Sequence, residues 1–215
     1  MLHNPNNIRT AGVPLEEASK VMIMVHGRGG SARDILSLSQ YIQDKDFAFI
    51  APEAQGNTWY PYSFLSPIEA NEPYLTSALD VLASVRARLQ ADFNFKPTQI
   101  YWLGFSQGAC LALEFVARNA SDYGGVFGLS GGLIGPPETP RAYEGSLSNT
   151  PIFLGCSDTD SHIPKERVLE SDAVFRKMGA KVTTKLYTNF PHTINEDELK
   201  IVNLLIAGEE LPVGT

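Results

Sequence analysis

The sequence predicts an α/β fold, in which a mostly parallel sheet is covered by helices on both faces. Short apolar runs alternate with segments whose apolar residues recur roughly every three or four positions, the patterns of buried strands and amphipathic helices. Strands that alternate with helices in this way form parallel sheets. The length of 215 residues suits one large domain, so we expect a single domain over residues 1–215.

Continuous apolar runs mark the strands of the first half. Residues 21–25, 47–51 and 100–104 are almost wholly apolar, as expected of strands buried on both faces. Helical spacing marks the segments between them, with Ile35, Leu38 and Ile42 after the N-cap Ser31, and Leu75, Leu79, Leu82, Val85 and Leu89 further on. Residues 52–73 lack any period and are rich in aromatic side chains, so we expect a functional loop there.

The second half repeats the alternation. Its predicted strands are residues 125–129, 152–156 and 182–187, and its predicted helices are residues 108–117, 164–178 and 196–206. Asn195 is a suitable N-cap for the last helix, whose first turn is acidic and favours the helix dipole. Residues 131–150 are rich in Gly, Pro and Ser and predict a loop, and residues 8–16 predict one or two short edge strands.

Composition argues against several classes of protein. The net charge is −7 and basic residues do not cluster, which disfavours a nucleic-acid partner. The apolar runs fall short of the about 18 residues that span a membrane, and the first residues lack a secretory signal, so we expect a cytoplasmic protein without stable membrane insertion. Cys110 and Cys156 give neither a disulfide pattern nor metal-ligand spacing, and we expect both to be buried.

Residues 104–108 (GFSQG) fit the pattern G-x-S-x-G between a predicted strand and a predicted helix. In this context the pattern predicts a tight turn that presents Ser106 as a nucleophile at the top of the sheet. The amide that follows the nucleophile, that of Gln107, and one amide of the glycine-rich residues 26–30 (HGRGG) would form the oxyanion hole.

A serine nucleophile needs a base, and the base needs an acid to orient it. The chain order in α/β-hydrolases is serine, acid, histidine. Of the four histidines, only His192 follows the nucleophile from a separate late loop at the carboxyl end of a strand, so it is the predicted base. We expect His3 to lie in a frayed terminus. Asp158 and Asp160 both fit as the acid, and spacing does not separate them.

Residues 26–29 (HGRG), GFSQG, Asp160 in the segment DSHIP, and His192 together resemble the phospholipase/carboxylesterase family. This family comprises small α/β-hydrolases without a cap domain and includes acyl-protein thioesterases. The resemblance implies Asp160 as the acid and the Arg28 and Gln107 amides as the oxyanion hole. It also implies a substrate cleft lined by Trp59 and Tyr60, to which we add Phe64.

Two departures from the family put a long fatty-acyl substrate in doubt. Its thioesterases often have Leu where Arg28 stands, and the segments 60–64 (YPYSF) and Pro136-Pro137 suggest a different cleft entrance. We expect the Arg28 side chain to point to solvent or to an acidic group of the substrate.

The resulting hypothesis is a serine hydrolase that cleaves small-molecule carboxylic esters, thioesters or lysophospholipids through an acyl-enzyme, with no metal or organic cofactor. One alternative is a non-catalytic binding protein on a hydrolase scaffold. Another is a serine hydrolase of a different bond, a peptidase or a dienelactone-type enzyme. Apolar surface around Trp59 and Phe64 could receive either a substrate or a second subunit of a homodimer.

Overall fold

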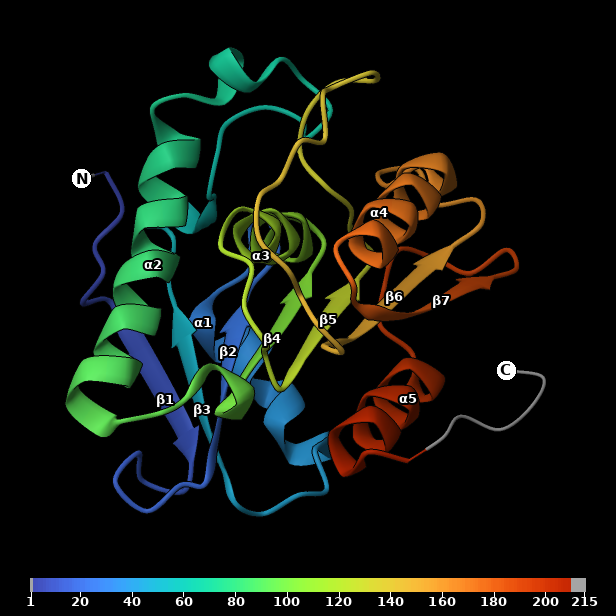
Figure 1. Ribbon diagram of the computed structural model, residues 1–215. Coiled ribbons are helices and arrows are strands. Elements are labelled where there is room, and N and C mark those ends of the chain that lie inside the picture. Colours follow the sequence, from blue (N-terminus) through green and yellow to red (C-terminus); the bar gives the residue numbers. More distant parts are fainter. Residues whose placement is uncertain (1, 210–215) are drawn as a thin grey trace.

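A computed structural model describes residues 2–209 of the chain, and its centre is one seven-stranded sheet (Figure 1). The strands lie in the order β1-β3-β2-β4-β5-β6-β7. All neighbours pair in parallel except β1, which pairs antiparallel with β3. The strands are β1 (Ile8–Gly12), β2 (Lys20–Val25), β3 (Phe47–Pro52), β4 (Ile100–Phe105), β5 (Gly125–Leu129), β6 (Pro151–Ser157) and β7 (Lys181–Tyr187).

Helices cover both faces of the sheet, which confirms the predicted fold class (Figure 1). One face is covered by α2 (Tyr74–Phe93), α3 (Gln107–Arg118) and α4 (Lys165–Lys177), and the other by α1 (Ala32–Leu36) and α5 (Glu196–Ala207). The central strands therefore bury both of their faces, and residues 21–25 of β2 have no exposed surface. No helix within residues 2–209 is both long enough and apolar enough to cross a membrane.

The structure refines several predicted boundaries. The predicted helix after Ser31 is a short α-helix followed by a 3-10 helix over Ser37–Tyr41. The segment predicted as one or two edge strands forms the single strand β1, whose outer side is solvent-exposed as expected of a sheet edge. Residues 210–215 lie outside the described part of the chain, so a single domain over residues 1–215 stays a prediction.

The prediction of a frayed segment around His3 is wrong. Only 1% of His3 is exposed, and the backbone amides of Leu2 and His3 both donate to the Ser77 hydroxyl of α2 at 2.9 Å. The side-chain bonds of His3 reach residues more than fifty positions away, so no local sequence pattern marks it as buried.

Candidate active site

Ser106 occupies a strained turn between β4 and α3. Its φ of 55° and ψ of −120° lie in a region that non-glycine residues seldom adopt. Two glycines permit the turn: a Cβ at Gly104 would lie 2.5 Å from the Gly108 carbonyl oxygen, and a Cβ at Gly108 would collide with the backbone of Val25. Strand and helix therefore approach closely, and the Ser106 side chain lies in the wall of an open cleft.

A continuous chain of short hydrogen bonds joins Ser106, His192 and Asp160. The Ser106 hydroxyl oxygen lies 2.8 Å from His192 Nε2, and His192 Nδ1 lies 2.6 Å from Asp160 Oδ2. The Asp160 carboxylate is fully buried and also accepts hydrogen bonds from the amides of His162 and Ile163. Burial alone would raise the pKa of Asp160, but the hydrogen bonds from His192 and the two amides together hold it below its usual value.

The two aspartates that the sequence leaves open occupy different places. Asp158 does not contact the imidazole: its carboxylate accepts from the Asn189 amide at 2.9 Å, and its amide donates to the Tyr187 carbonyl at 3.0 Å. Asp158 therefore ties the loop that carries Asp160 to the loop that carries His192. His162 lies on the other side of the base, with its ring centre 4.7 Å from that of His192.

Arg28 and Gln107 line the same cleft as Ser106. Among the residues that the structure describes, neither amide donates to another protein group, so both are available to an oxyanion. The Arg28 side chain is exposed, in line with the solvent alternative of its prediction, but it is also fixed in place. Its guanidinium donates to the carbonyls of Pro61 and Tyr62 at 2.9 and 2.7 Å, so it fastens the cleft wall.

The cleft has a volume of about 430 Å³. Tyr60 and Phe64 belong to its lining, together with Tyr62, Ile163 and residues of the 26–30 loop, of the turn that carries Ser106 and of the loop that carries His192. The structure differs from the prediction at Trp59, which is fully buried behind the lining and donates its indole N–H to the His26 carbonyl at 2.9 Å. An aromatic pair in sequence does not reveal which ring faces the cleft, because adjacent side chains in an irregular loop can point in opposite directions.

Both cysteines are buried, as predicted. Cys110 forms part of the cleft floor one helical turn after Ser106, and burial raises its pKa to about 12. The thiol therefore stays protonated at neutral pH and does not compete with Ser106 as a nucleophile.

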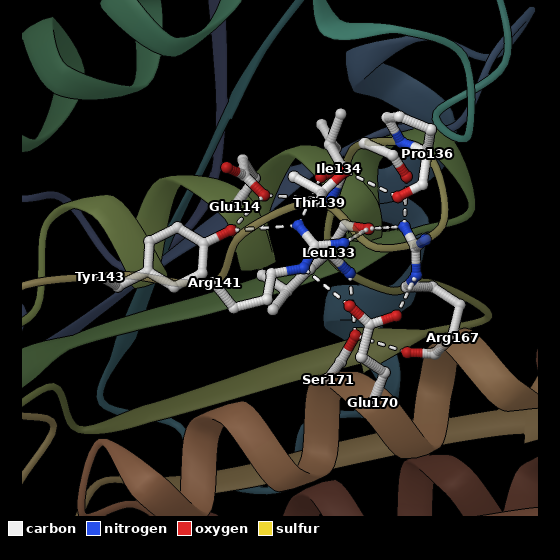
Figure 2. A network of polar contacts seen from close by, with 11 residues as sticks. Glu114, Leu133, Ile134, Pro136, Thr139, Arg141, Tyr143, Arg167, Glu170 and Ser171 are labelled. Carbon is white, nitrogen blue, oxygen red and sulfur yellow. Dashed lines mark hydrogen bonds and ion pairs between the residues drawn. The ribbon is translucent and has the colours of Figure 1, made fainter.

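The loop after β5 is held against α3 and α4 by a cluster of charged residues that the sequence analysis did not find (Figure 2). Arg167 of α4 donates to the carbonyls of Leu133 and Gly135 at 2.7 and 2.6 Å, and Glu170 bridges Arg167 and Arg141. The remaining members are Glu114, which accepts from the Ile134 amide and the Tyr143 hydroxyl, and Ser171, which accepts from the Leu133 amide. Apart from Arg167 and Glu170, which lie three residues apart on α4, the members come from segments distant in sequence, so local spacing does not reveal the cluster.

Comparison with known proteins identifies the family. A sequence profile of the phospholipase/carboxylesterase family matches residues 8–207. The chain belongs to the phospholipase/carboxylesterase family. It is 27% identical to acyl-protein thioesterase 1 of Saccharomyces cerevisiae over 91% of this chain and 94% of that protein.

Solved structures agree with this membership. A phospholipase/carboxylesterase from Dyadobacter fermentans superposes with a TM-score of 0.92 at 43% identity, covering 96% of this chain and 98% of that one. Esterase PE8 superposes with a TM-score of 0.79 at 25% identity, covering 93% and 97%. The family member described here is a carboxylic ester hydrolase with an α/β-hydrolase fold.

Proposed function

We propose that Ser106, His192 and Asp160 form the catalytic triad of this ester hydrolase. The observation that carries the proposal is the pair of hydrogen bonds from Ser106 through His192 to the buried Asp160. His192 Nε2 accepts the hydroxyl proton while Ser106 attacks the ester carbonyl, and it returns the proton to the leaving alcohol. Asp160 holds the imidazole with Nδ1 protonated and stabilises the imidazolium.

The Arg28 and Gln107 amides stabilise the oxyanion of the tetrahedral intermediate. Gln107 is the first residue of α3, so the positive end of the helix dipole points to the same place. Water then attacks the acyl-enzyme, with His192 again as the base. Each step uses a group that already lies at the cleft, and the resulting product is a carboxylic acid.

The substrates that fit this chemistry are small-molecule esters, with thioesters and lysophospholipids as close chemical relatives. Tyr60 and Phe64 give the cleft an apolar wall that suits the hydrocarbon part of such a substrate. Cytoplasmic location and a homodimer stay predictions, but Trp59 and Phe64 are buried and do not offer the exposed apolar surface that the sequence analysis expected there.

A series of p-nitrophenyl esters from acetyl to palmitoyl tests the triad. We expect the wild type to hydrolyse at least part of the series and Ser106→Ala to lose turnover while remaining folded. Asp160→Asn removes the acceptor that fixes the imidazole tautomer, and we expect a loss of about 10⁴ in kcat. Asp158→Asn is the matched control, because an amide oxygen can still accept from Asn189, and its kcat should stay within about threefold of the wild type.

Two outcomes would contradict the triad. Equal losses in Asp160→Asn and Asp158→Asn would show that the acid was wrongly assigned. Turnover in Ser106→Ala would show that another group is the nucleophile. A fluorophosphonate probe that labels the wild type at Ser106, without any ester being hydrolysed, would favour the rival hypothesis of a serine hydrolase acting on a different bond.

A further inference from the structure

The segment before β1 contacts a loop beside the candidate site, although it lies outside residues 8–207 that match the family. His3 is held against α2 by the Ser77 hydroxyl, and its ring inserts between α2 and the loop after β3. The ring makes two hydrogen bonds to that loop: Nδ1 accepts from the Gln55 amide at 3.0 Å, and Nε2 lies 2.8 Å from the Trp59 carbonyl oxygen.

These partners define the protonation state of His3. An amide N–H can only donate, so Nδ1 is unprotonated and Nε2 carries the proton that bonds to the Trp59 carbonyl. The neutral ring satisfies both bonds, whereas a doubly protonated ring would oppose the Gln55 amide. Burial lowers the pKa of His3, which favours the neutral form that this geometry requires.

The segment that His3 holds has a strained backbone. Gly56 and the non-glycine Asn57 are consecutive residues with φ of 64° and 59°. Such a turn needs support from outside itself. Two parts of the molecule supply that support: the His3 ring, through its two hydrogen bonds, and the 26–30 loop.

The same segment positions the 26–30 loop. The Asn57 carbonyl accepts from the Gly29 amide and its side chain donates to the Gly30 carbonyl, both at 2.8 Å. Trp59 donates its indole N–H to the His26 carbonyl, and the Ala54 amide donates to His26 Nε2 at 3.1 Å. The bonds to His26, Gly29 and Gly30 thus hold residues on both sides of Arg28.

Three packed aromatic rings connect His3 to the 26–30 loop. The Trp59 ring lies between the two imidazoles, with its centre 5.5 Å from that of His3 and 5.0 Å from that of His26. His3, Trp59 and His26 are all buried. A displacement of His3 is therefore transmitted through packed rings and directed hydrogen bonds to the residues before and after Arg28.

We propose that His3 is a positioning residue, which holds the amide of Arg28 in place for the oxyanion through the 54–59 segment. The inference rests on the proposed function, because it assigns His3 a part in the oxyanion hole proposed above. His3 itself contacts no reacting atom. Its effect should therefore appear in the stabilisation of the tetrahedral state and much less in the binding of the planar ester.

The test compares His3→Ala and His3→Gln with Asn4→Ala. Ala removes both bonds to the loop, whereas a Gln amide nitrogen can still donate to the Trp59 carbonyl. Asn4→Ala removes an exposed hydrogen bond within the same segment, to the Asn6 amide, and leaves the loop untouched. We expect kcat on a p-nitrophenyl ester to fall about ten- to hundredfold in His3→Ala and less in His3→Gln, with KM within about twofold.

A transition-state analogue separates positioning from general loosening of the fold. A trifluoromethyl ketone forms a tetrahedral adduct that needs the oxyanion hole, so its inhibition constant should rise in His3→Ala by about the factor by which kcat/KM falls. Rates are normalised to the sites that a fluorophosphonate titrates. If His3→Ala does not fold, Ser77→Ala loosens the same segment while it keeps the imidazole, and should give a smaller change in the same direction.

The remaining outcomes distinguish a failure of the inference about His3 from a failure of the proposed catalytic triad. An active wild type whose kcat and inhibition constant are unchanged in His3→Ala overturns the inference and leaves the triad intact. A loss that disappears when rates are expressed per titrated site also overturns it, because His3 would then only stabilise the fold. A wild type that neither hydrolyses esters nor reacts with the fluorophosphonate overturns the proposed function itself, and the inference with it.

Discussion

Two neighbouring loops, one that lines the cleft and one that packs behind it against Phe64, are held in place by different chemistry. Residues 54–60 are held by neutral hydrogen bonds and aromatic packing, from His3, His26 and the Gln107 side chain, and the exposed Arg28 guanidinium holds the next two carbonyls. Residues 131–143 are held by the buried ion cluster around Arg167 and Glu170. Hydrogen bonds between neutral groups position individual amides. The ion cluster instead binds several carbonyls at once and holds its loop as one unit.

The two loops meet at Phe64. Its carbonyl accepts from the Gly135 amide at 2.8 Å, and the Arg167 guanidinium lies over its ring at 5.9 Å from the ring centre. If the two modes of support have different tasks, their loss should have different consequences. Damage to the ion cluster should mainly lower the free energy of unfolding, and damage to the neutral bonds should mainly lower kcat.

The largest expected effect comes from Arg167→Met. Arg167 is 4% exposed, and its removal leaves the Leu133 and Gly135 carbonyls and one oxygen of Glu170 without their donor. A buried carbonyl left without a donor costs about 1–3 kcal/mol, so the two carbonyls together with the lost contact to Glu170 should cost about 3–5 kcal/mol of unfolding free energy. Chemical denaturation should show a loss of this size, while kcat per folded molecule stays within about threefold.

Lys20→Met is the matched control for the loss of one cation. Lys20 pairs with Asp44 at 2.7 Å, but both side chains are partly exposed, so we expect a loss below about 1 kcal/mol. A comparable loss in both variants would contradict the idea that burial makes the Arg167 cluster important. A large fall in kcat of Arg167→Met would contradict the division of tasks between the two loops.

The sequence could predict the strands, the helices and the order of the candidate site residues, because these depend on local patterns. A buried strand is a short apolar run, and the turn that carries Ser106 has its two glycines beside it. The carboxyl ends of parallel strands lie at one edge of the sheet, which brings Ser106, Asp160 and His192 into one region. Choosing Asp160 over Asp158 needed either the family resemblance or the structure.

The side chains that hold the loops around the candidate site could not be predicted from local patterns. His3 bonds to Trp59, 56 positions away, and Arg167 bonds to Leu133, 34 positions away. Such pairs leave no periodic signal, because one partner in each is a backbone carbonyl in a loop, which any type of residue supplies. The Arg28 amide was predicted from the glycine-rich loop, but the direction of its side chain depends on carbonyls 33 and 34 positions further on.

Glu198 differs from the ion cluster around Arg167. It is a buried carboxyl on the side of the candidate site, and it forms no ion pair within residues 2–209. It caps α5 by accepting from the Asn195 amide at 2.9 Å, close to the loop that carries His192. Burial raises its pKa from 4.5 to about 7. The folded chain therefore holds a proton between these values that the unfolded chain has released, and stability falls as the pH rises through this window.

Glu198→Gln should remove this pH dependence, because Gln keeps the capping geometry without the charge. We expect the unfolding free energy of the wild type to decrease between pH 4.5 and 8, relative to that of the variant, by at most about 3 kcal/mol. Denaturation at several pH values measures the difference. Parallel curves for the two proteins would mean that Glu198 titrates near its ordinary value and that its burial costs little.

The most specific expected change belongs to Gln107→Ala. The substitution keeps the Gln107 backbone amide but removes the side chain, which accepts from the Trp59 amide at 3.0 Å and donates to the Tyr60 carbonyl at 2.8 Å. We expect kcat to fall about tenfold, because the 54–59 segment and the 26–30 loop shift together. The unfolding free energy should also fall, by about 1–3 kcal/mol, because the Trp59 amide and the Tyr60 carbonyl are buried and lose their partner, and the vacated space adjoins the cleft and can admit water.

Gln107→Ala and Arg167→Met together test the division between the two loops. If the neutral bonds position the oxyanion amides, Gln107→Ala loses more kcat and less stability than Arg167→Met. In a double variant of Gln107→Ala and His3→Ala, the losses in kcat should be less than additive, because both side chains hold the same segment. Fully additive losses would show that His3 and Gln107 act on the site by separate routes, and that the 54–59 segment does not move as one unit.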